Sequence, residues 1–193
     1  MPMKSRIRTA PAPLRAPANE RFRKLCAALA TACLALAWTA PMLVPIQWWF
    51  GGADSLLVLA HLGPGDVQNP MRGSLHAVGV LIGAVPVLLG AWSLCQAHEC
   101  LTSFARGEVF TASAARHLRR LAMRVGATAV AAFAAVPALS AVLTWDNAIG
   151  ARAIVVGGGL AHALVLLCAM LLWLLGGVLR QGQLLAEENA AFL

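Results

Sequence analysis

The sequence contains little charge. Only 12% of its 193 residues are Asp, Glu, Lys or Arg, whereas about a quarter of the residues in soluble domains are charged. Hydrophobic residues make up 60% of the chain, and the mean hydropathy is +0.73. Such a chain is too apolar to remain folded in water, and its apolar residues are expected to lie in lipid. The low charge therefore excludes an ordinary soluble domain and indicates an integral membrane protein.

Recognisable catalytic motifs are also missing. The sequence has no P-loop, GxSxG, HExxH or dinucleotide fingerprint, and no acidic residue lies in the middle of an apolar stretch. The five cysteines are an odd number, and none falls in a predicted outward loop, which argues against a disulfide framework. We predict that the protein is not an enzyme and that it holds no cofactor and no metal.

Four apolar stretches are long enough to cross a membrane, which takes about 20 residues. They lie at about 25–49, 75–95, 121–145 and 153–179. We predict an all-α integral membrane protein, in which residues 25–180 form an antiparallel bundle of four transmembrane helices. A Pro-rich, disordered tail is expected at 1–24, and a short C-terminal tail at 181–193.

The basic residues are distributed unevenly along the chain. Thirteen of the fifteen Lys and Arg residues flank the apolar stretches on one side, and only Arg72 and Arg152 fall on the other. Basic residues accumulate on the cytoplasmic side of membrane proteins, so both termini are predicted to be cytoplasmic. The net charge of +7 is then explained by contact with the lipid bilayer rather than with nucleic acid.

The connector between the second and third stretches, residues 101–120, is the most distinctive segment. Gly107 is suited to a turn, and Thr111 to capping the helix that follows. From about residue 112, the helical spacing places several arginines opposite Leu118 and Leu121. This pattern predicts a short basic amphipathic helix on the cytoplasmic membrane surface before the third span. The candidate binding residues of this loop are Phe104, Arg106, Gly107, Glu108, Phe110 and Thr111.

Two histidines, His76 and His162, fall in the outer halves of the second and fourth spans. Ionisable side chains within a membrane are candidates for function, although a neutral histidine also serves simple packing between helices. A further cluster, Cys95, His98, Glu99 and Cys100, offers metal-ligand types. Cys95 and His98 share a helix face at i,i+3, but Cys100 points elsewhere, and no second CxxC or HxxxH supplies the further ligands that a zinc site needs. Ordinary interfacial residues are the preferred interpretation.

The segment from Phe104 to Thr111 has the form F-x-x-G-x-x-F-T, and Arg116 to Ala122 has the form R-x-L-R-x-L-A. With the Gly-Leu-Glu-Asn pattern of residues 182–189, these segments resemble a family of bacterial inner-membrane proteins, domain of unknown function 2975. The resemblance implies a four-helix fold in the bacterial inner membrane and no established activity. Members of that family are often encoded beside a small helix-turn-helix regulator.

Three hypotheses for function follow. The leading one is a small non-enzymatic membrane protein whose cytoplasmic loop and C-terminal tail bind a regulatory protein; alternatively, that loop only shapes the hairpin. The second is a transporter or channel subunit for a small solute, with a polar cavity lined by His76, His162, Ser140 or Thr144. The third is a metal- or redox-linked membrane protein.

Overall fold

The computed structural model describes residues 20–50, 57–63, 65–68, 73–108, 111–157 and 159–191. It contains four long helices: α1 (Glu20–Phe50), α3 (Gly73–Ala105), α4 (Ala112–Leu143) and α5 (Leu160–Ala191). Each contains a segment long and apolar enough to cross a membrane. The predicted all-α, four-helix membrane fold is confirmed. Most of the predicted N-terminal tail, as well as Phe110, lies outside the described residues.

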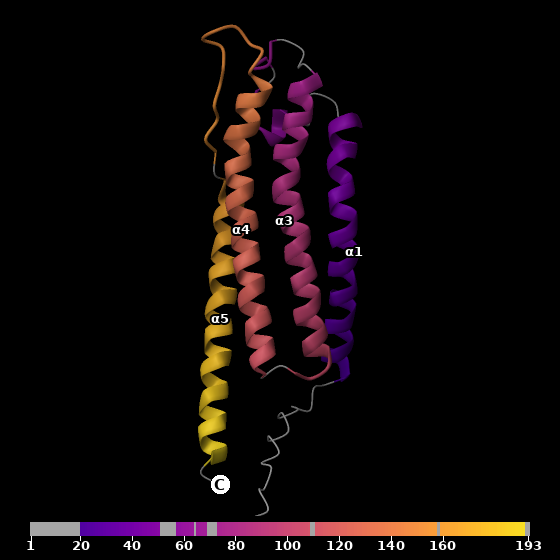
Figure 1. Ribbon diagram of the computed structural model, residues 1–193, viewed down its shortest axis with the longest axis vertical. Helices are drawn as coiled ribbons and strands as arrows, with labels where there is room; N and C mark the ends of the chain where they lie inside the picture. Colours follow the sequence, from indigo (N-terminus) through magenta and orange to yellow (C-terminus); the bar gives the residue numbers. More distant parts are fainter. Residues whose placement is uncertain are drawn as a thin grey trace, which may run out of the picture.

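The four helices stand side by side in chain order (Figure 1). Extensive packing joins α1 to α3, α3 to α4 and α4 to α5, and no other helix pair in the described part of the chain packs to a similar extent. We call the end at which α1 and α4 begin the basic end, and the opposite end the distal end. The helices carry exposed apolar side chains such as Trp38, Leu81 and Leu174, as expected for surfaces that lie against lipid.

Small residues make the helix contacts. Cys26, Ala30 and Ala37 are the buried residues of α1, and they recur at spacings of four and seven, which places them on one face. In α4 the buried side chains include Ala115, Ala122 and Ala129, again seven apart. Because lipid provides no hydrophobic drive for helices to associate, close approach of the backbones through small side chains is what holds such helices together.

Pairs of Trp and Arg mark the two ends of the apolar region. The Arg124 guanidinium lies 4.0 Å from the Trp92 ring centroid, and that of Arg152 lies 5.1 Å from the Trp145 ring at the distal end. Residues 125–144, which are the rest of α4 and its C-cap, lie between these pairs and contain no charged side chain. Twenty helical residues span about 30 Å, the thickness of a bilayer core, so the paired residues mark the two membrane boundaries.

The basic segment after the α3–α4 turn does not form a separate helix. Residues 112–120 are the first turns of α4, which continues without a break to Leu143. Thr111 caps the helix at its start, and the segment contains no Gly or Pro before Gly126 to interrupt it. The predicted surface helix is therefore not observed.

Helix α5 begins and ends later than the predicted fourth span. Residues 151–157 have no regular secondary structure, and α5 begins at Leu160. We call Ala151–Gly157 the return segment, because it runs back beside the distal part of α4 before α5 starts (Figure 1). At the other end, residues 181–191 continue α5 as helix, where a separate tail is expected from the sequence.

Candidate functional site

The loop between α3 and α4 is a tightly hydrogen-bonded turn. The Glu108 N–H donates to Ser103 O (3.1 Å), and the Gly107 N–H donates to Phe104 O (3.0 Å). This is the Schellman pattern that ends helices, and it needs a left-handed residue at the position of Gly107. Gly107 has φ +82° and is buried. The glycine of the F-x-x-G segment therefore serves to stop α3.

The other side of the turn is fixed as well. Thr111 is the N-cap of α4, and its Oγ1 accepts from the Ala114 N–H at 3.2 Å, as predicted. From the neighbouring helix α1, the Arg23 Nε donates to Ala105 O at 3.0 Å. The loop backbone is thus held from three directions: by the end of α3, the start of α4 and the start of α1.

The remaining candidate residues of this loop are not used by the turn. Arg106 is exposed, and Phe104 and Glu108 are half-buried. Among the described residues, neither the Arg106 guanidinium nor the Glu108 carboxylate forms an ion pair or a side-chain hydrogen bond. Two charged groups of opposite sign therefore stand on a fixed backbone and remain available for an external partner.

A polar network that is not evident from the sequence lies just above this loop. Gln96 is only 1% exposed, and its Nε2 lies 2.8 Å from both Glu99 Oε2 and His117 Nδ1. The imidazole also lies 3.4 Å from the same carboxylate oxygen. This network links α3 to α4 close to the turn, and so adds to the rigidity of the loop. The one sequence signal for it is an amide in an otherwise apolar stretch.

The Cys/His cluster of α3 is divided among different neighbours. His98 Nδ1 lies 2.9 Å from Ala30 O of α1, whereas Glu99 is directed to His117 of α4. Cys100 is buried. No group of three His, Cys, Asp or Glu side chains within the described ranges is arranged to hold a metal ion.

At the distal end, three buried side chains of α4 and the turn that follows it hold the return segment. The Val155 N–H donates to Ser140 Oγ (2.9 Å), and the Ala153 N–H donates to Thr144 Oγ1 (3.2 Å). These contacts pair backbone groups that would otherwise face lipid. The hydroxyls of Ser140 and Thr144 therefore support the fold, rather than line a polar cavity.

Asn147, which the sequence does not single out, completes this arrangement. Its Nδ2 donates to Asp66 O (2.6 Å) and Ala151 O (3.0 Å), and its Oδ1 accepts from the Gln68 N–H (2.9 Å). The side chain is 4% exposed. One amide thus joins the α1–α3 loop to the return segment.

The two membrane histidines are not brought together. His76 of α3 makes an edge contact with Trp49 of α1, at 6.5 Å between ring centroids. His162 of α5 makes one with Phe133 of α4 at 6.4 Å, and its buried Nδ1 has no hydrogen-bond partner among the described residues. Because α3 and α5 are not among the helix pairs that pack extensively in the described part of the chain, the structure shows no shared site for this pair.

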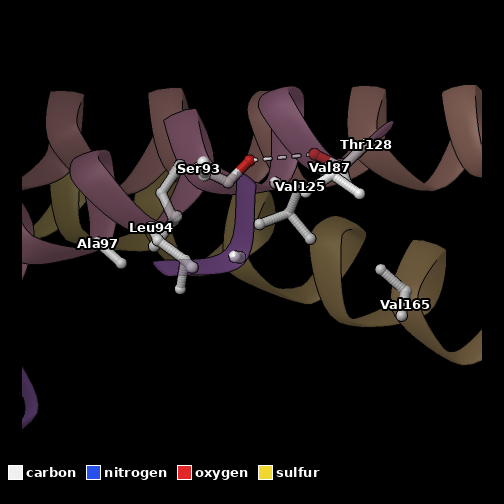
Figure 2. Close-up of a pocket in the computed structure, with 11 residues that line it drawn as sticks. Val87, Ser93, Leu94, Ala97, Val125, Thr128 and Val165 are labelled. Atoms are coloured by element: carbon white, nitrogen blue, oxygen red, sulfur yellow. Dashed lines mark hydrogen bonds between the residues drawn. The ribbon is translucent and has the colours of Figure 1, made fainter. Parts of the chain in front are cut away.

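An apolar groove of about 430 Å³ lies beside the boundary that Arg124 and Trp92 mark, and it is lined by all four helices. Ala40 and Val165 border it, and α3 and α4 form its floor. Figure 2 shows its one polar contact among the residues drawn, between Ser93 Oγ and Thr128 Oγ1, 3.2 Å apart. Each hydroxyl also donates within its own helix, to Leu89 O and Arg124 O. A hydroxyl has one hydrogen, and in both residues that hydrogen is already donated to the helix backbone. The groove therefore has few polar groups with which to bind a solute.

Comparison with known proteins agrees with the resemblance drawn from the sequence motifs. No curated protein and no solved structure matches the chain. The sequence profile of the family described as "Protein of unknown function (DUF2975)" matches residues 36–191, which include all of α3, α4 and α5, the turn between α3 and α4, and the return segment. The chain is therefore a multi-pass membrane protein that belongs to the DUF2975 family.

Proposed function

We propose that this protein is a non-enzymatic protein of the bacterial inner membrane, whose basic end faces the cytoplasm and binds a regulatory protein there. The orientation is supported by the Lys and Arg residues that the structure describes, nine of ten of which lie toward this end, because basic residues are retained on the cytoplasmic side. Both chain termini are then cytoplasmic.

One observation carries the proposal: the charges of Arg106 and Glu108 stand on a loop backbone that other residues have already fixed. The Gly107 turn, the Thr111 cap and the bond from Arg23 to Ala105 O hold the backbone without either charge. A rigid surface loses little conformational entropy when a partner binds, which favours affinity. A loop that served only to connect two helices would not need these two charges.

Helix α5 extends the same surface. Gly176 lies beside Ala115 and Arg119 of α4, so the antiparallel α5 runs past the start of α4, and its last turns project beyond the α3–α4 loop (Figure 1). Leu185, in this projecting part, is 61% exposed. Together, the loop and the end of α5 present charged and apolar groups, a combination typical of protein interfaces.

The proposal is tested by affinity purification of the full chain from membranes in mild detergent. With the Arg106→Ala/Glu108→Ala variant, the recovered amount of a specific protein partner is expected to fall roughly tenfold or more, as it does when central interface residues are removed. The matched control is Glu20→Ala/Lys24→Ala, which also removes one charge of each sign at the basic end, from an exposed i,i+4 pair. The same partners in the same amounts with both variants would refute the proposal.

A further inference from the structure

A second cavity, with both charged and apolar side chains in its lining, lies between α4 and α5 at the basic end. Its volume is about 320 Å³. It is lined by Arg119 of α4 and by Trp173, Gly177, Arg180, Gln181 and Leu184 of α5. The α5 residues follow spacings of three and four, so they form one face of that helix. We call this cavity the headgroup pocket.

The position of Arg119 in the headgroup pocket depends on a close approach of the two helices. A Cβ added to Gly176 would lie 2.7 Å from Arg119 Cγ and 3.4 Å from Ala115 O. The missing side chain therefore leaves room for the Arg119 stem to cross α5. Its guanidinium then lies 5.2 Å from the Trp173 ring centroid, a cation–π distance.

The pocket brings together two positive charges without a neutralising carboxylate among the described side chains. Neither Arg119 nor Arg180 forms an ion pair with any of those side chains. Guanidinium groups present a planar fork of donors that fits the oxygens of a phosphate. Two of them converging on one cavity, beside an amide at Gln181 and an aromatic ring, form a suitable environment for a phosphate monoanion.

The depth of the pocket in the membrane indicates where such a phosphate comes from. Arg119 lies five residues beyond the boundary marked by Arg124 and Trp92, or about 7 Å along the helix. The polar headgroup layer on each side of a bilayer is of similar depth, roughly 5–8 Å. Trp173 lies on the membrane side of the two arginines, and indole rings favour that interface.

From these observations we infer that the headgroup pocket binds the phosphate of an anionic phospholipid. Arg119 and Arg180 hold the phosphate oxygens, Gln181 donates to the polar part of the headgroup, and Trp173 lies against the start of the acyl chains. Free inorganic phosphate has the same charge chemistry, but it lacks the apolar part that Trp173 and Leu184 would contact.

The test is native mass spectrometry of the full chain in detergent, titrated with phosphatidylglycerol or with phosphatidylcholine. The wild type is expected to retain one phosphatidylglycerol in preference to phosphatidylcholine. Arg119→Gln/Arg180→Gln is expected to weaken that binding roughly 30-fold, since each basic residue near a membrane surface contributes about one kcal/mol. Arg120→Gln removes an exposed charge from the next position of α4, outside the pocket, and is the matched control.

A second pair of variants keeps every charge. A Cβ at Gly177 or at Gly182 meets no atom within 4 Å, so neither position is crowded where a side chain would begin. Gly177→Leu fills the headgroup pocket and is expected to weaken phosphatidylglycerol binding about tenfold, whereas Gly182→Leu, outside the pocket, leaves it unchanged.

Three results would overturn the inference. The first is unchanged lipid binding in the arginine pair variant and in Gly177→Leu. The second is an equal loss in Arg120→Gln, which would indicate diffuse surface charge. The third is displacement of the lipid by millimolar inorganic phosphate, which would make the pocket a site for the free ion.

Discussion

The polar side chains that hold the return segment at the distal end contrast with two exposed arginines at the basic end. At the distal end, the side chains of Ser140, Thr144 and Asn147 are buried, and each is bonded to backbone of the return segment. At the basic end, Arg106 and Arg180 are exposed, and neither forms an ion pair with the side chains that the structure describes. The comparison separates polar groups that complete the fold from those available to bind, and it predicts different consequences of mutation at the two ends.

The largest expected effect on stability is at the distal end. Asn147→Ala removes bonds to Asp66 O, Ala151 O and the Gln68 N–H and leaves partly buried backbone groups unpaired. The free energy of unfolding should fall by about 3 kcal/mol. Heat denaturation in detergent measures this, with Ile149→Ala as the control, because that side chain is 98% exposed. Equal melting temperatures for the two variants would contradict the structural role of Asn147.

A smaller effect is expected where α4 and α5 meet at the basic end. Gly176→Leu places atoms where Arg119 Cγ and Ala115 O already lie. The resulting separation of the helices should lower the unfolding free energy by about 2 kcal/mol. The adjacent Gly177→Ala has open space for its Cβ and should be neutral or slightly stabilising, since alanine favours helix. The same denaturation assay compares the two variants. A Gly177→Ala variant less stable than Gly176→Leu would refute the close packing of α4 and α5 at Gly176.

The smallest effect on stability is expected in the α3–α4 loop. Thr111→Ala removes the acceptor for the Ala114 N–H and should lower stability by about 1 kcal/mol. Thr111→Ser keeps the hydroxyl and should restore most of the loss in a denaturation experiment. A serine variant as unstable as the alanine variant would mean that the hydroxyl does not act as a cap.

Much of the fold follows from local properties of the sequence. Apolar length alone predicts four helices, because lipid leaves the backbone no alternative partners. Gly107 and Thr111 also act within the turn itself. Gly107 adopts the left-handed conformation, and the Thr111 side chain accepts a hydrogen bond at the start of α4. Both roles can be predicted from the neighbouring sequence.

The features that could not be predicted depend on contacts between distant segments. Ala153 to Val156 continue the apolar stretch of the fourth span, so hydropathy includes them in it. Ser140 and Thr144 instead capture their backbone groups at separations of 15 and 9 residues, and the glycines at 157–159 disfavour helix. Likewise, nothing in the spacing of Gln96 indicates its contact with His117, 21 residues later.

The contrast between the two ends is tested most directly by site-specific photocrosslinking in native membranes. A photoreactive residue is placed at Phe104 or Leu185, at the basic end, and at Ile149, at the distal end; none of these lines the headgroup pocket. We predict that both positions at the basic end crosslink to the same protein, that Arg106→Ala/Glu108→Ala abolishes the product at Phe104, and that Ile149 gives no such product. Crosslinks confined to lipid or to the chain itself at both ends would contradict the account and leave the α3–α4 loop a purely structural turn.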